Sequence, residues 1–300
     1  MNDFFDIFIN DFDKYIPIIL FICLTLLILY IIFRFKASML LIPRNIKDTR
    51  NYEAYIPRKV PLDYDLDLYY YFTSITGSST EIGTYYFIFP YLLKWLKSSN
   101  IMLRVDLDKS RFKEACDHND YNIVLLESPK FNGILEKYLW EFLEKASEKY
   151  VLSIAGLCKY AKAHEYTIRK DLSNILAKLR AKATKDGLLQ YIDLKNFILT
   201  DKGLEKVKEF NNFKSFIYKF TKDCYNIDLD KKLWDDFLIL SGFFNYSYQL
   251  NEAYKKLNIS YRFASENKFS KDYLDIDYIL YIALYANHLS DVFEIQTSDN

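Results

Sequence analysis

The hydrophobic pattern is dominated by an uninterrupted apolar run over residues 15–33, which contains no charged residue. At about 1.5 Å per residue, a helix of this length crosses the roughly 30 Å hydrocarbon layer of a bilayer. A helix in a soluble core rarely lacks a polar face over such a length. The pattern therefore predicts one N-terminal transmembrane helix, preceded by a short tail over residues 1–14.

The charges on the two sides of this run differ in sign. Four aspartates and one lysine precede it, whereas the basic residues Arg34, Lys36, Arg44, Lys47 and Arg50 follow it. A cleaved signal peptide would instead have a basic start, a shorter apolar stretch and small residues at its exit. By the positive-inside rule, we expect a single-pass cell-membrane protein with its N-terminus outside and its body in the cytoplasm.

A polar segment with three prolines, over residues 34–62, follows the run and is interpreted as a tether. A first folded unit is expected over residues 63–130. It contains an apolar helix near residues 87–96 and a short strand at 101–106, where apolar and polar residues alternate. A second short strand is expected at 121–126. A helix followed by two short strands is typical of a small winged-helix-like α+β unit.

The clearest amphipathic helix is expected at residues 132–150, at the start of a second unit over residues 131–220. Ser153 is a plausible N-cap for a short helix to residue 163, and a third helix follows over 167–186. A hairpin at 188–192 and 197–199 completes the winged-helix order. With a helical region over 221–300, the predicted fold class is α+β, mostly α, with the transmembrane helix followed by tandem winged-helix-like units.

Charge changes this picture only locally. The 300 residues contain 40 Lys and Arg and 40 Asp and Glu, so the net charge indicates no particular class of partner. Residues 149–219 nevertheless hold fifteen basic and seven acidic residues, while residues 220–300 hold eight basic and thirteen acidic ones. The 27 Tyr and 24 Phe, with few Gly and Pro, indicate an AT-rich bacterial genome rather than a binding function.

Candidate chemistry is sparse. The seven glycines show no phosphate-binding spacing, and the three histidines and four cysteines show no metal or redox spacing. Cys116 and His118 form only a lone C-x-H in a polar loop, and the four cysteines are expected to be free thiols. The acidic pairs Asp106 with Asp108 and Asp235 with Asp236 are interpreted as solvated surface. We therefore predict no catalytic residue, no cofactor and no metal.

One helix has a sharper interpretation. Six basic residues lie on or beside the third helix of the second unit, which is the recognition helix in winged-helix DNA binders. If they face outward, they can neutralise phosphates. The same residues could contact anionic lipid headgroups, or they could be an ordinary solvated face. These candidate contact residues are Arg169, Lys170, Lys178, Arg180, Lys182 and Lys185.

Three short stretches resemble a known family. They lie at residues 199–203, 213–217 and 233–238, and include Leu199, Thr200, Gly203, Phe213, Lys214, Phe216, Ile217, Leu233, Trp234, Asp235, Phe237 and Leu238. In these stretches the chain resembles the C-terminal cytoplasmic region of the YciQ-like predicted bacterial membrane proteins, a domain of unknown function. The resemblance covers residues 52–248. It implies topology and fold, and it transfers no catalytic residue, because the family has none established.

These observations predict a non-enzymatic interaction or scaffold protein, anchored in the membrane and facing an unknown protein partner. The alternative is a membrane-tethered winged-helix regulator that binds DNA through the basic helix. The two hypotheses differ in the expected effect of salt, because phosphate contacts weaken steeply as salt rises.

Overall fold

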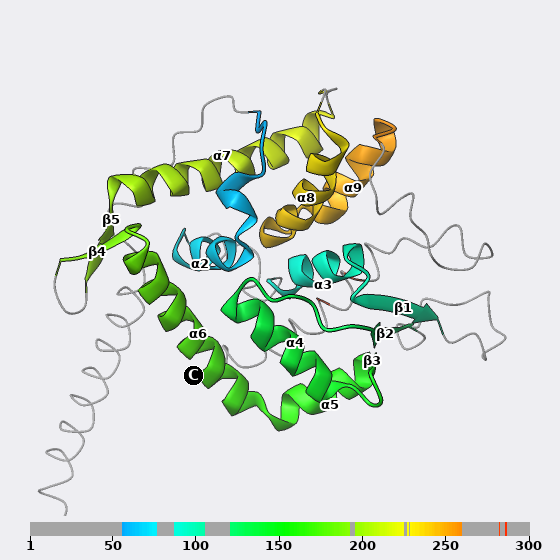
Figure 1. The fold of residues 1–300 in the computed structure, drawn as a ribbon. Helices are drawn as coiled ribbons and strands as arrows, with labels where there is room; N and C mark the ends of the chain where they lie inside the picture. Colours follow the sequence, from blue (N-terminus) through cyan, green and yellow to red (C-terminus); the bar gives the residue numbers. More distant parts are fainter. Residues whose placement is uncertain are drawn as a thin grey trace, which may run out of the picture.

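The computed structural model describes residues 56–76, 87–105, 121–192, 196–224, 227, 229–259, 282 and 286. Over these residues the protein is mostly helical and has two small antiparallel sheets (Figure 1). The helices and short 3-10 turns are η2 (Pro61–Tyr64), α2 (Leu66–Thr76), α3 (Ile88–Lys97), α4 (Ile134–Ala146), α5 (Ile154–Ala163), α6 (Glu165–Lys185), α7 (Asp201–Asp223), α8 (Lys231–Ser241), η4 (Gly242–Phe244) and α9 (Ser247–Lys256). The strands are β1 (Ile101–Val105), β2 (Tyr121–Leu125), β3 (Val151–Ser153), β4 (Leu189–Tyr191) and β5 (Phe197–Leu199).

The three-stranded sheet has the order β1-β2-β3, and both pairings are antiparallel. Ile101 pairs with Leu125 at one end of the β1–β2 ladder, and Asn122 pairs with Ser153 in the β2–β3 ladder. On this sheet, Leu103 and Ile123 point into the core, because alternate residues of a strand face opposite sides. The strand β3 leads directly into α5, so the sheet fixes where α5 begins.

Local signals in the sequence set the ends of the next helices. The Ser153 side chain caps α5 by accepting a hydrogen bond from Gly156 N at 3.0 Å. The long helix α6 ends before Gly187, whose φ of 72° favours glycine. After the β4–β5 hairpin, Thr200 caps α7 by accepting a hydrogen bond from Gly203 N at 3.1 Å. These caps place α6 and α7 on either side of the hairpin (Figure 1).

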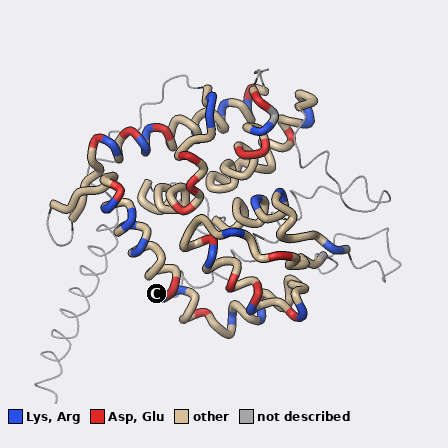
Figure 2. The backbone as a smooth tube through the Cα atoms, viewed as in Figure 1, with Lys and Arg blue, Asp and Glu red and all other residues tan. Residues whose placement is uncertain are grey.

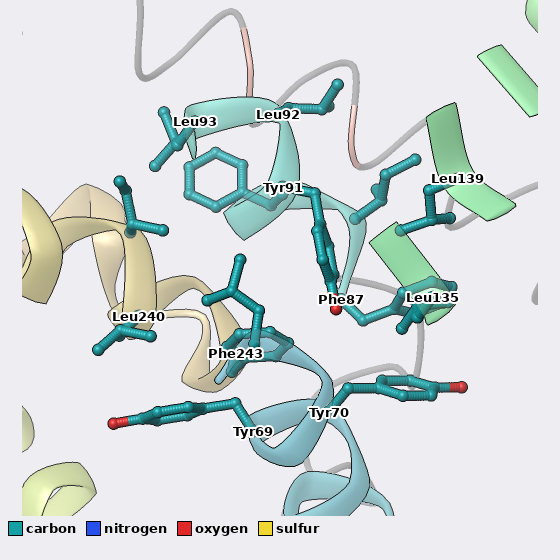
Figure 3. Close-up of a cluster of buried hydrophobic side chains, with 14 of the residues drawn as sticks. Tyr69, Tyr70, Phe87, Tyr91, Leu92, Leu93, Leu135, Leu139, Leu240 and Phe243 are labelled. Carbon is teal, nitrogen blue, oxygen red and sulfur yellow. The ribbon is translucent and has the colours of Figure 1, made fainter. Parts of the chain in front are cut away.

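The core is built largely from aromatic rings between α2, α3, α7, α8 and η4. Tyr69 stacks on Phe243 with ring centroids 5.6 Å apart, and Phe210 meets Phe244 at 5.1 Å. Figure 3 shows Tyr69 and Phe243 gathered with Tyr91 of α3, while Leu135 of α4 lies on the other side of the cluster. Such pairs add about 0.5–1.5 kcal/mol each beyond the area they bury. Among the described residues, most aromatic side chains therefore belong to this core.

The first correction to the predicted fold class concerns the transmembrane helix. Among the described residues, no helix combines the length and the apolar character needed to cross a bilayer. The predicted transmembrane segment, residues 15–33, lies outside the described residues, as do the tail over 1–14 and residues 34–55 of the tether. Pro61 and Leu62, which the sequence analysis placed in the tether, are buried against the fold. The location and orientation inferred from the flanking charges stay predictions.

The second correction to the predicted fold class concerns the separation into two units. The expected order of the second unit is present as α4, α5, α6, β4 and β5. However, β3 pairs with β2 of the first predicted unit instead of joining the β4–β5 hairpin. The helix α2 also packs directly against α6. The described residues therefore form one connected fold, in which β3 of the second predicted unit belongs to the sheet of the first and the β4–β5 hairpin stands apart from that sheet.

Candidate functional site

The helix α6 has a sharply divided surface. Its inner face is apolar, and Ile168, Ile175, Leu179 and Ala183 are buried at helical spacing against α2, α4 and the hairpin. Its outer face points away from the rest of the described fold (Figure 1). The exposed residues of this outer face are Tyr166, Thr167, Lys170, Ser173, Asn174, Ala177, Lys178, Ala181, Lys182 and Lys185.

The outer face of α6 carries positive charge only. The two acidic residues of the helix, Glu165 and Asp171, are half-buried near its N-terminal end, and none occurs from Leu172 to Lys185. Figure 2 shows Lys and Arg recurring along this C-terminal part of α6, toward the hairpin. The face therefore offers several ammonium groups to an anionic surface. Acidic residues lie only at its edges, where Asp65 pairs with Lys182 and Asp186 follows Lys185.

The six basic residues singled out from the sequence fall into different settings. Lys170, Lys178 and Lys185 are exposed, and no ion pair or hydrogen bond joins their side chains to another residue within the described ranges. Lys182 is exposed at the rim, with its Nζ 2.9 Å from Oδ2 of Asp65 at the start of α2. Partial burial lowers the pKa of Lys182, but the hydrogen bond and charge of Asp65 outweigh it and raise that pKa above its ordinary value.

The two arginines of the set are engaged within the fold. Arg169 Nη2 lies 2.8 Å from Oε1 of Glu165, four residues earlier on the same helix. Arg180 is half-buried, and its guanidinium carbon lies 5.4 Å from the centroid of the Phe197 ring on β5. The structure thus brings the four lysines to one face. Arg180 packs α6 against the hairpin, and Arg169 forms an ion pair within α6.

A second group of charged residues, between α2, α3 and α4, is buried. Asp67 is 3% exposed and accepts hydrogen bonds from Tyr91 Oη at 2.9 Å, Ile134 N at 2.6 Å and Leu135 N at 3.3 Å. It therefore caps the N-terminus of α4 from α2, because Gly133 supplies no side chain there. Desolvation outweighs these donors and raises the pKa of the Asp67 carboxyl.

Glu136 is the other buried acid of this group and is 2% exposed. Its Oε1 accepts hydrogen bonds from Lys94 Nζ at 2.7 Å and Trp95 Nε1 at 3.1 Å, and its Oε2 accepts one from Asn132 N at 3.1 Å. Each of these partners belongs to α3 or to the segment that enters α4. We define Asp67, Glu136, Lys94 and Tyr91 as the buried polar cluster, and its contacts join three helices.

One ion pair corrects an expectation from the sequence. Asp235 and Asp236 were interpreted as solvated surface, but Lys97 Nζ of α3 lies 2.7 Å from Asp236 Oδ1 and 4.0 Å from Asp235 Oδ2. Asp235 is only 4% exposed. These aspartates therefore fasten α8 to α3. The other acidic pair, Asp106 with Asp108, lies outside the described residues.

The described part of the chain offers no cluster for a metal ion, since nowhere in it do three or more His, Cys, Asp or Glu side chains come together. Cys116 and His118 lie outside the described residues, and Cys158 and Cys224 are free thiols. The sequence pattern did not predict the buried polar cluster. The only available signal was an acidic residue on the apolar side of a helix, at Asp67 and again at Glu136.

Comparison with known proteins finds no match: no protein-family model, no curated protein and no solved structure is significantly similar to this chain. The resemblance to the YciQ-like family therefore stays a prediction. The candidate site accordingly rests on the geometry of α6 alone.

Proposed function

We propose that this protein is a non-enzymatic interaction module that presents the outer face of α6 to a partner. The observation that carries the proposal is the contrast between the two faces of this helix. The inner face is filled by apolar contacts, whereas the outer face holds Lys170, Lys178 and Lys185 without partners among the described residues. Free charges on a rigid element are suited to contact rather than to stabilisation.

The buried acids support the non-enzymatic part of the proposal. Asp67 and Glu136 are the two most buried carboxylates of the described residues, and burial can adapt a carboxylate for acid-base chemistry. Both are instead occupied by backbone N–H groups and by Lys94, Trp95 and Tyr91 side chains that join α2, α3 and α4. A carboxylate surrounded in this way positions helices and presents no free oxygen to a substrate.

Site-specific photo-crosslinking in cells tests the proposal with the full-length chain. A photoreactive amino acid replaces Ala177 at the centre of the outer face, and a matched variant carries it at Gln249, an exposed position on α9. We expect discrete adducts from position 177 that position 249 does not give. Equal labelling from both positions, or none from position 177, would contradict the proposal. Nuclease and protease digestion then identifies the chemical class of each adduct.

A further inference from the structure

We infer that the partner of the outer face of α6 is the phosphate backbone of duplex DNA, with the helix lying in the major groove. The inference rests on the proposed function, because it names the partner of the same face. It is argued from charge, from the size of the side chains on the face and from the order of the surrounding elements.

The lysines are spaced to reach phosphates on both sides of a groove. Lys170 and Lys185 are fifteen residues apart, which is about 22 Å along a helix, and Lys178 lies between them. The major groove of B-form DNA is about 12 Å wide. A helix that crosses it obliquely therefore places its end lysines near the phosphates of both strands while its middle lies over the bases.

The middle of the face is shaped for close approach. The exposed residues between the outer lysines include Ser173, Asn174, Ala177 and Ala181, all of which have short side chains. Short side chains allow the backbone of a helix to approach base edges, and an asparagine can form two hydrogen bonds with adenine. The outer face thus carries exposed lysines along its length, at 170, 178, 182 and 185, with short side chains between them.

The order of elements places α6 where a DNA-reading helix is expected. It is the third of three helices, α4, α5 and α6, and the β4–β5 hairpin follows it directly. In helix-turn-helix proteins, a corresponding helix enters the major groove while its neighbours hold it in place. Here Arg180 packs on Phe197 of the hairpin, and Ile175 and Leu179 are buried on the inner face. Only the outer face of α6 is therefore available to DNA.

The same face suits other anionic partners less well. A helix that lies on a membrane surface places large apolar residues beside its lysines. Protein interfaces gain most of their affinity from aromatic and arginine anchors. The outer face has one large aromatic residue, Tyr166, which is 80% exposed, and neither of the helix's arginines is free. Repeated lysines around small polar side chains match a phosphate backbone best.

Fluorescence anisotropy of a labelled random-sequence duplex, titrated with the full-length chain, tests the inference. Three phosphate contacts at roughly −0.9 each predict a slope of about −2.7 for log affinity against log salt, or about 40-fold weaker binding between 50 and 200 mM salt. The variant Lys170→Gln/Lys178→Gln/Lys185→Gln should lose this salt-dependent binding. The matched variant Lys208→Gln/Lys219→Gln/Lys256→Gln removes equal charge from exposed sites on α7 and α9 and should retain it.

Three results would overturn the inference: no binding by the wild-type chain, equal losses in both variants, or binding to phosphatidylglycerol vesicles but not to the duplex. The crosslinking experiment distinguishes these failures from a failure of the proposed function. Nuclease-resistant adducts from position 177, with no DNA binding, would retain an interaction surface and replace its partner. Absence of adducts from position 177 would remove the surface itself.

Discussion

The buried polar cluster and the outer face of α6 use charged side chains in opposite ways. In the cluster, Lys94 Nζ lies 2.7 Å from Glu136 Oε1. Each carboxylate oxygen of Asp67 and Glu136 accepts a hydrogen bond. On the outer face, Lys170 and Lys178 are exposed and have no partner in the described fold. The comparison teaches that burial and pairing, rather than the number of charges, separate structural groups from groups available for contact.

The largest expected effect comes from breaking the buried pair. Glu136→Ala leaves the ammonium of Lys94 and the indole N–H of Trp95 without their acceptor, so we expect a loss of about 3 kcal/mol in the free energy of unfolding. Urea denaturation followed by tryptophan fluorescence measures it, because Trp95 and Trp140 lie nearby with ring centroids 5.1 Å apart. Glu136→Gln keeps the acceptor and should lose less. Equal stability of all three proteins would show that the pair is not structural.

A smaller loss is expected from filling the space between Gly133 and Asp67. A Cβ atom at position 133 would lie within 2.5 Å of the Asp67 carboxylate carbon, so the carboxylate must move away from the N–H groups of α4. We expect Gly133→Ala to cost about 2 kcal/mol in the free energy of unfolding. Asp67→Ala removes the same cap. The loss of stability in the double variant Gly133→Ala/Asp67→Ala should therefore be less than the sum of the two single losses. Additive losses would show that the two residues act independently.

The raised pKa of Asp67 predicts a dependence of stability on pH. The folded state binds the Asp67 proton more tightly than the unfolded state, whose carboxyl titrates near its ordinary value of 3.8. The free energy of unfolding should therefore fall as pH rises from that value through the raised folded pKa, relative to Asp67→Asn, which cannot titrate. Denaturation curves across acidic pH measure the difference. A wild-type chain that gains stability relative to Asp67→Asn over this range would contradict the assignment.

Substitution of Lys182, at the edge of the outer face, should have a weak and salt-sensitive effect on the free energy of unfolding. Lys182 and Asp65 form an exposed ion pair at 2.9 Å, and such pairs contribute about 0.2–1 kcal/mol. Lys182→Gln should lose no more than this at low salt, and the loss should disappear as salt is added. A loss that persists at high salt would place Lys182 with the structural groups.

The smallest effect on stability is expected for the lysines proposed to contact DNA. Lys170→Gln/Lys178→Gln/Lys185→Gln should change the free energy of unfolding by less than about 0.5 kcal/mol, because exposed substitutions away from packed contacts rarely do more. Urea denaturation measures this in the same preparation that is used for DNA binding. A large loss of stability would mean that these lysines support the fold, and the comparison between the two regions would fail.

The sequence predicts structure well where local signals are strong. The periodic apolar residues of α4 and the cap at Ser153 act over a few residues, so they are visible in the chain. It predicts structure poorly where long-range contacts decide whether a strand or a helix forms. The strand β3 is three residues long and pairs with β2 across the chain, and α2 is an aromatic run without a polar face. The sequence of β3 does not distinguish it from a loop, and the sequence of α2 does not distinguish it from a strand.

The candidate site was predicted only in part, because several of its contacts join residues far apart in the chain. Spacing places Arg169, Lys170, Lys178 and Arg180 on one helix and indicates the i,i+4 pair of Arg169 with Glu165. It cannot show that Arg180 meets an aromatic ring of the hairpin. The partners of the arginines are Glu165, on the same helix, and Phe197, in the hairpin. The buried acids Asp67 and Glu136 were missed because their partners come from other helices.

Lysine footprinting of the wild-type full-length chain tests the central claim most directly. The chain is acylated with an amine-reactive reagent with and without random-sequence duplex DNA, and each lysine is quantified by mass spectrometry. We predict that the duplex slows acylation of Lys170, Lys178 and Lys185 while exposed lysines on α7 and α9, at 208, 219 and 256, react as before. Unchanged acylation of the α6 lysines, or equal protection at both sets of positions, would contradict the account.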